Sequence, residues 1–149
     1  MVHDLYQETI LDHSKRPRNC HAMEHADRKA EGYNPLCGDK LELFLKMNGD
    51  VVEDASFVGS GCAISTASAS LMTESLKGKS RDEALRIMEK FHDLLTTDTP
   101  VSKDLGKLVV FCGVRDYPAR VKCATLAWHT LKSALTSDSS NAVTTEDDA

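Results

Sequence analysis

The sequence predicts a small α+β domain in which helices cover an antiparallel sheet of about three strands. Two patterns indicate this class. Apolar and polar residues alternate in two segments joined by a turn, which is typical of a β-hairpin. Several other segments repeat apolar residues every three or four positions, as amphipathic helices do. The 149 residues suit one domain rather than two, and we expect it to span residues 1–135.

A helix is expected over residues 4–13, because Pro17 disfavours helix in the residue before it. Its apolar stripe either fills the core or docks a partner protein, and it consists of Leu5, Tyr6, Ile10 and Leu11. The segment over residues 19–35 has no clear period and ends in turn-forming residues, namely Gly32, Asn34 and Pro35.

A hairpin is expected between strands over residues 41–47 and 51–58, with Asn48-Gly49 as the turn signal. A two-residue loop would place Leu43 opposite Asp54 and so mismatch the two faces. We therefore expect a three-residue loop over residues 48–50. In that register the pairs are Leu41 with Phe57, Leu43 with Ala55, and Met47 with Val51.

Three further helices are expected. The first runs from about Cys62 to Gly78, and its first half consists mostly of Ala, Ser and Thr, which permits close packing. The second follows a capping box of Ser80 and Glu83 and extends to residue 95. Residues 96–107 form a linker, and the apolar run 108–114 suits either a short helix or a strand. The last helix begins near Pro118, with a buried stripe of Ala124, Ala127, Trp128, Leu131 and Leu135.

The negative charge is concentrated at the C-terminal end. The chain has 18 basic and 23 acidic residues, a net charge of −5. Residues 136–149 contain four acidic residues and no basic one, so the rest of the chain has 18 basic and 19 acidic residues, a charge of −1. We expect this acidic tail to be disordered, and nothing in the chain suggests a nucleic-acid partner. No segment suits a membrane span or a signal peptide, so we expect a cytoplasmic protein.

The most informative short motif is Cys37-Gly38-Asp39. In extended backbone the Cys37 and Asp39 side chains project to the same side, and Gly38 lets a backbone or an ion approach closely. Thiolates and carboxylates are both ligands that zinc accepts. The odd number of cysteines, five, also favours metal or thiol chemistry over a disulfide framework.

Two further cysteines lie in surroundings that favour the thiolate form. Cys62 is at the start of an expected helix, where the positive end of the helix dipole stabilises an anion. Cys123 directly follows basic residues, among them Arg120. With Cys37 and Asp39 these two cysteines make a four-ligand set that suits tetrahedral coordination by sulfur and oxygen.

The other candidate ligands have simpler explanations. Free cysteine is often buried, so any cysteine can be a core residue, and this is the preferred interpretation for Cys112 within its apolar run. Cys20 is expected to be a surface thiol. His21 and His25 are four positions apart, but no helix is expected there. The other histidines are expected to lie at the surface or to be hydrogen-bonded in the core, and they are His3, His13, His92 and His129.

Six short motifs occur in a fixed order: Leu5-Tyr6, Ile10-Leu11-Asp12-His13, Pro17-Arg18-Asn19, Cys37-Gly38-Asp39, Gly61-Cys62-Ala63-Ile64-Ser65 and Lys122-Cys123-Ala124. In this order they resemble the IscU/NifU N-terminal family of iron–sulfur cluster assembly proteins. The resemblance covers about residues 4–135 and implies an α+β fold of the SufE/NifU type. One departure is His21, where the family usually has glycine.

Three departures from the classical scaffold branch of that family resemble its SUF-system branch (SufU type). Lys122 stands where the scaffold branch has histidine before its third cysteine. Residues 116–120 lack the Leu-Pro-Pro-Val-Lys segment that a chaperone recognises. The spacing of 61 positions between Cys62 and Cys123 is also longer than in the scaffold branch.

The resemblance implies a zinc-dependent sulfurtransferase. A pyridoxal-phosphate cysteine desulfurase (SufS type) would present a persulfide, and Cys37, displaced from zinc, would accept its sulfur for downstream SUF assembly proteins. Arg120 would steer Asp39 or Cys37 during the exchange. Two alternatives stay open: a scaffold that holds a transient [2Fe–2S] cluster on the same ligands, and a non-catalytic protein whose zinc only stabilises the fold.

Overall fold

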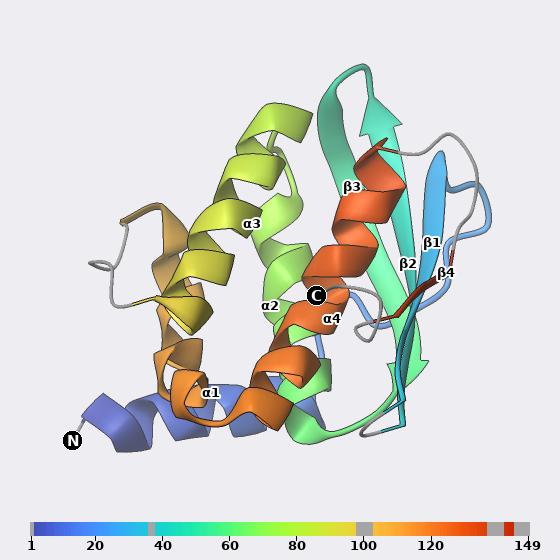
Figure 1. Ribbon diagram of the computed structural model, residues 1–149. Helices are drawn as coiled ribbons and strands as arrows, with labels where there is room; N and C mark the ends of the chain where they lie inside the picture. Colours follow the sequence, from blue (N-terminus) through green and yellow to red (C-terminus); the bar gives the residue numbers. More distant parts are fainter. Residues whose placement is uncertain (1, 36–37, 98–102, 137–141, 145–149) are drawn as a thin grey trace.

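Figure 1 shows the computed structural model, which describes residues 2–35, 38–97, 103–136 and 142–144. Five helical segments and four strands follow one another along these residues. In chain order they are α1 (Val2–Lys15), β1 (Arg28–Asn34), β2 (Asp39–Asn48), β3 (Val51–Ser60), α2 (Ala63–Leu76), α3 (Arg81–Thr96), the 3₁₀ helix η1 (Lys103–Asp116), α4 (Pro118–Thr136) and β4 (Ala142–Thr144).

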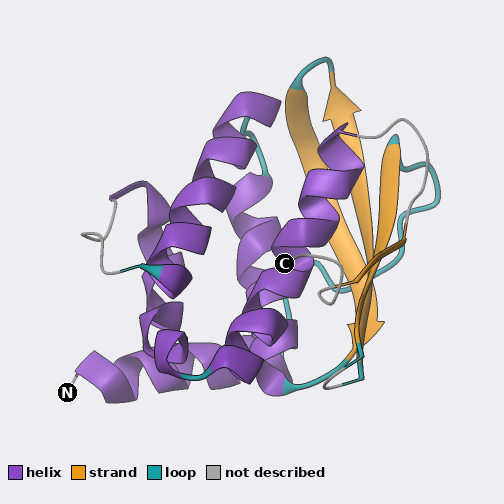
Figure 2. Ribbon diagram, viewed as in Figure 1, coloured by secondary structure: helices purple, strands orange, loops and turns teal. Residues whose placement is uncertain are grey.

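The helices lie on one side of the sheet, as Figure 2 shows. β1, β2 and β3 are antiparallel, and the strand order is β3-β2-β1-β4. α4 packs on β1 and β2, and α2 packs on β3. This confirms the expected α+β class. The short strand β4 pairs in parallel with β1. These three residues belong to the tail that was expected to be disordered. The other residues after Thr136 lie outside the described residues.

The sequence showed no period where β1 lies, and the burial of its residues explains why. Its buried face consists of Ala30, Gly32 and Asn34, none of which is a large apolar residue. Large side chains do not fit there because α4 is too close. A Cβ atom on Gly32 would collide with Thr130 Oγ1 and lie 3.1 Å from Leu126 Cδ1.

The expected hairpin is present, but its predicted register is wrong. The loop has two residues, and Gly49 adopts a positive φ of 63° that glycine tolerates. A bulge then shifts the pairing between Lys46 and Met47. The observed pairs are Leu43 with Phe57, Leu45 with Ala55, and Asn48 with Val51. The bulge shifts β3 by one residue against β2, so that the apolar residues of the two strands lie opposite each other. A two-residue loop without the bulge would not give these pairs.

The remaining helices agree with the sequence pattern. Cys62 is the N-cap of α2. The capping box of Ser80 and Glu83 lies at the start of α3, and each of its two hydrogen bonds is 3.1 Å long. The apolar run 108–114 is helical and forms part of η1. The expected linker 96–107 is therefore shorter than predicted, since η1 begins at Lys103, and residues 98–102 lie outside the described residues.

A polar clasp holds the N-terminal segment against α2. Ser70 Oγ accepts a hydrogen bond from the Arg18 backbone N–H at 2.9 Å and lies 2.7 Å from His13 Nδ1. Asn19 Nδ2 donates to Thr73 Oγ1 at 3.1 Å. These contacts give structural roles to His13 and to the Pro17-Arg18-Asn19 motif. In α1, Ile10 packs on the core and Leu11 is exposed, whereas the Leu5 and Tyr6 side chains lie outside the description.

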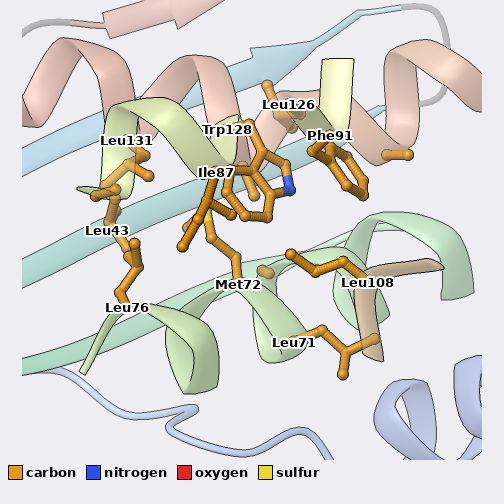
Figure 3. Close-up of a cluster of buried hydrophobic side chains, with 14 of the residues drawn as sticks. Leu43, Leu71, Met72, Leu76, Ile87, Phe91, Leu108, Leu126, Trp128 and Leu131 are labelled. Atoms are coloured by element: carbon orange, nitrogen blue, oxygen red, sulfur yellow. The ribbon is translucent and has the colours of Figure 1, made fainter. Parts of the chain in front are cut away.

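The main core lies between the sheet and the helices, around Trp128 of α4 (Figure 3). The indole stacks on the Phe91 ring at a centroid distance of 4.8 Å, and Phe111 meets Phe91 edge-on at 5.7 Å. Trp128 Nε1 donates to Ser68 Oγ at 3.2 Å, and Ser68 Oγ donates to the Ala124 carbonyl at 2.5 Å. The small residues of α2 therefore let α4 approach closely.

The contact between β1 and α4 can be tested with Gly32→Ala. The added methyl group would collide with Thr130, so we expect the free energy of unfolding in urea to fall by about 1–3 kcal/mol. Thr130→Ala removes the colliding hydroxyl group. The double variant should therefore lose less unfolding free energy than the two single variants lose in sum. Additive losses would contradict the close contact between Gly32 and Thr130.

The clasp predicts a pH-dependent stability. Burial lowers the pKa of the His13 imidazole from its ordinary 6.5, Arg18 lowers it further, and Glu74 opposes this. The unfolded chain therefore binds a proton that the folded chain resists, and stability is lost as the pH falls below 6.5. Between about pH 7.5 and about pH 5.5, metal-free wild-type protein should lose more stability in urea than His13→Gln. Parallel losses in the two proteins would exclude His13 as the cause.

Candidate metal centre

Three of the four predicted ligands meet at one end of the sheet. β1 ends there, β2 begins there, and the first turns of α2 and α4 lie beside them, at the lower end of the view in Figure 1. The ligand atoms of Asp39, Cys62 and Cys123 all lie within 4.8 Å of one another. Cys37, the fourth predicted ligand, lies outside the described residues.

Asp39 is the first residue of β2, and its side chain is fully buried. Oδ1 accepts a hydrogen bond from the Cys62 backbone N–H at 2.8 Å, and Oδ2 accepts one from Asn34 Nδ2 at 3.1 Å. A buried carboxylate is costly unless such donors or a cation compensate its charge. The two donors therefore hold the carboxylate in a fixed orientation beside the two sulfur atoms.

Cys62 is held by the start of α2. Its backbone is extended, and its Sγ accepts a hydrogen bond from the Ser65 N–H at 3.4 Å. The preceding residue, Gly61, is needed for space: a Cβ atom there would collide with Asp39 Oδ1 and lie 3.0 Å from its Cγ. Gly38 was predicted to let a backbone or an ion approach closely, and no backbone does so, because a Cβ atom there would meet nothing within 4 Å. Gly38 instead adopts a positive φ of 74°.

Cys123 lies in the second turn of α4 and is 2% exposed. Its Sγ is 3.5 Å from Asn34 Nδ2. The hydrogen bond from Ser68 to the adjacent Ala124 carbonyl fixes this part of α4 against α2. The distance between the two cysteines is therefore set by helix packing rather than by a local loop.

Asn34 belongs to the site, although its residue type and neighbours in the sequence predict only a turn. It is fully buried, and it contacts both Asp39 and Cys123. The available signal was its position: Asn34 shares the inward face of a strand with Ala30 and Gly32. That signal could be used only once β1 was recognised as a strand.

Arg120 was expected to steer Asp39 or Cys37. Its side chain is exposed, and its guanidinium carbon lies 4.6 Å from the centroid of the Tyr117 ring. Within the described residues, no hydrogen bond or ion pair joins Arg120 to Asp39. The structure thus brings together three of the predicted ligands but does not add Arg120 to them.

The other cysteines and histidines lie elsewhere. Cys20 is exposed, and Cys112 is partly buried against the core, as predicted. His21 and His25 are both exposed. None of the four described cysteines forms a disulfide, and in the described part of the chain only one cluster has the spacing of metal ligands.

The donor set suits a metal ion. Two sulfur atoms and a carboxylate within reach of one ion are donors of the kind that zinc accepts in proteins, and Asp39 and Cys123 are buried while Cys62 is partly exposed. Cysteine thiolates also bind iron–sulfur clusters, so the donors alone do not distinguish the two. In the described residues no helix is long and apolar enough to cross a membrane.

Fold and cluster together define a small α+β protein with a candidate metal site of sulfur and oxygen donors at one end of its sheet. Residues 5–137 match the family model of the NifU-like N-terminal domain, and the chain belongs to this family.

Three known proteins illustrate the similarity. The zinc-dependent sulfurtransferase SufU of Bacillus subtilis (strain 168) is 44% identical, over 86% of this chain and 87% of its own. The iron–sulfur cluster assembly scaffold protein IscU of Streptococcus pyogenes serotype M1 is 41% identical, over 90% of this chain and 84% of its own. A crystal structure from Fervidobacterium islandicum AW-1, of a protein described as a candidate scaffold for the SUF system, has a TM-score of 0.82 at 39% identity, covering 90% of this chain and 98% of its own.

The position of Gly61 predicts the effect of a small substitution. In Gly61→Ala the new methyl group would push the Asp39 carboxylate away from Cys62, so we expect zinc affinity to fall by about tenfold to hundredfold. Zinc affinity is measured by competition with a chromogenic chelator. Gly113→Ala is the matched control, because a Cβ atom there meets nothing within 4 Å. Equal losses in both variants would contradict the steric argument.

Proposed function

We propose that the protein is a cytoplasmic, zinc-dependent sulfurtransferase that accepts persulfide sulfur from a cysteine desulfurase for iron–sulfur cluster assembly. The observation that carries this proposal is the cluster of Asp39, Cys62 and Cys123, whose ligand atoms lie within 4.8 Å of one another. The name of the Bacillus subtilis relative, a zinc-dependent sulfurtransferase, supports the same function.

Asp39, Cys62 and Cys123 would hold zinc together with Cys37, the ligand proposed from the sequence motif. Bound zinc would keep the thiols deprotonated and close together without redox chemistry of its own. Backbone and side-chain N–H groups orient the described ligands: the Cys62 N–H holds Asp39, and the Ser65 N–H holds Cys62. The chain thereby prepares the donors before any partner arrives.

Cys37 is the proposed sulfur acceptor. Its thiolate attacks the outer sulfur of the persulfide on the desulfurase cysteine. A new S–S bond forms on Cys37, the S–S bond of the donor breaks, and the desulfurase cysteine leaves as a thiolate, so no external oxidant is needed. Cys123, only 2% exposed, is poorly placed for this attack. Arg120 is proposed to steer Cys37 or Asp39, which requires it to leave the Tyr117 ring.

The proposed partners are a pyridoxal-phosphate cysteine desulfurase and downstream SUF assembly proteins. Leu11 on α1 is 49% exposed, which suits a docking role for the helix stripe better than a core role at that position. Ile10, by contrast, packs against the core. We therefore propose the docking role for Leu11 and the core role for Ile10.

A second candidate function is a scaffold on which a [2Fe–2S] cluster is built. The name of the Streptococcus pyogenes relative favours it, and the same thiolates suit iron. A third candidate is a structural zinc site without transfer chemistry, for which removal of zinc would unfold the chain.

One experiment separates these functions. The protein is purified anaerobically without added metal, and zinc, iron and acid-labile sulfide are measured per chain. A pyridoxal-phosphate cysteine desulfurase is then assayed with cysteine, with and without the protein. We expect about one zinc per chain and a stimulated desulfurase. In the wild-type protein, mass spectrometry should show an increase of one sulfur atom at Cys37. Cys37→Ala should abolish the stimulation. Cys20→Ala removes an exposed thiol outside the cluster and should behave as wild type.

Two results would overturn the proposal. Iron with matching sulfide, transferred to an apo-protein, would indicate the scaffold. Full stimulation by Cys37→Ala would exclude Cys37 as the acceptor and would leave the zinc with a structural role.

A further inference from the structure

Asn34 connects two of the metal-type ligands through one amide group. Its Nδ2 donates to Asp39 Oδ2 at 3.1 Å and to Cys123 Sγ at 3.5 Å. The residue is 0% exposed, so bulk water does not reach it. β1 supplies Asn34, β2 supplies Asp39 and α4 supplies Cys123, so the amide ties three elements together at the site.

The chemistry of the site explains why an amide donor suits this position. Three thiolates and one carboxylate around Zn²⁺ would carry two excess negative charges. The Nδ2 group offers two hydrogens and no negative charge, which matches one carboxylate and one thiolate acceptor. A carboxylate of the same shape would instead add to the negative charge.

The described ligands are thus restrained to different degrees. Asp39 accepts hydrogen bonds at both oxygens, from Cys62 N–H and from Asn34. Cys123 is buried and also accepts from Asn34, whereas Cys62 is more exposed and accepts from Ser65. A hydrogen bond to a thiolate withdraws charge from the sulfur and makes it a weaker nucleophile. At Cys123, unlike at the more exposed Cys62, burial also limits the access of an attacking group.

We propose that Asn34 is a positioning residue that holds Asp39 and Cys123 as permanent ligands and thereby confines ligand exchange to the other thiolates. This inference rests on the proposed function, because it concerns the same site. In this proposal Asn34 is neither a metal ligand nor a substrate contact. It acts through the orientation of Asp39 and through the reduced reactivity of the Cys123 sulfur.

The test compares Asn34→Leu, which keeps the approximate volume but removes both donors, with the wild type. Zinc affinity is measured by chelator competition with added Zn²⁺, and we expect it to fall by about tenfold to hundredfold. The zinc-loaded proteins are then treated with iodoacetamide, and the alkylation rate of each cysteine is followed by mass spectrometry. The rate at Cys123 should rise about tenfold relative to Cys112, the partly buried thiol outside the site.

Two further variants complete the test. Asn34→Asp keeps the shape, loses the donors and adds a charge, so it should weaken zinc binding in the same direction. Asn48→Leu changes an exposed asparagine at the other end of β2 and should leave both readouts unchanged. The pair of Asn34 variants keeps the test valid if one of them does not fold.

Unchanged zinc affinity and unchanged Cys123 reactivity in a folded Asn34 variant would overturn the inference. An equal rise at Cys112 and Cys123 would also overturn it, because that result indicates general loosening. Neither readout uses the desulfurase, so a failure of the proposed sulfur transfer would be seen only in the desulfurase assay and would not be confused with a failure here.

Discussion

The close packing of α4 against both the sheet and α2 is the constraint on which the site depends. Gly32 leaves room on β1 for Thr130, and Ser68 of α2 hydrogen-bonds to the Ala124 carbonyl. Both contacts need small residues at the crossing. Because Cys123 directly precedes Ala124, this packing brings its sulfur to the end of the sheet, beside Asp39 and Cys62. A larger residue at either crossing would move a ligand of the site as well as the core.

Helices and strands, rather than a loop, carry the three described ligands, and this suits the proposed exchange of one ligand while the others stay in place. Asp39 begins a strand, Cys62 caps one helix, and Cys123 lies within another. The hydrogen bonds to these ligands come from backbone N–H groups and from the buried Asn34 amide. Such donors lose little entropy when a metal binds, because they are already fixed.

The motifs shared with the family divide into two physical groups. One group builds the metal centre: Asp39, the Gly61-Cys62 pair and Cys123. The other group, with His13, Arg18 and Asn19, clasps the N-terminal segment onto α2 through Ser70 and Thr73. The two groups meet on α2, whose first turn carries a ligand and whose middle carries the clasp. In this chain, these motifs therefore serve either the candidate metal site or the alignment of α2.

The sequence by itself determined the α+β class, the amphipathic helices, the capping box before α3 and the identity of Asp39, Cys62 and Cys123 as candidate ligands, since these follow from local periodicity and residue chemistry. Only the tertiary structure decided the strand at residues 28–34, the hairpin register and the role of Asn34. Their signals are non-local: β1 has small buried residues because α4 covers it, and the register depends on a bulge that no alternation pattern encodes. Local physics therefore specified which atoms can bind a metal, and helix packing specified that they meet.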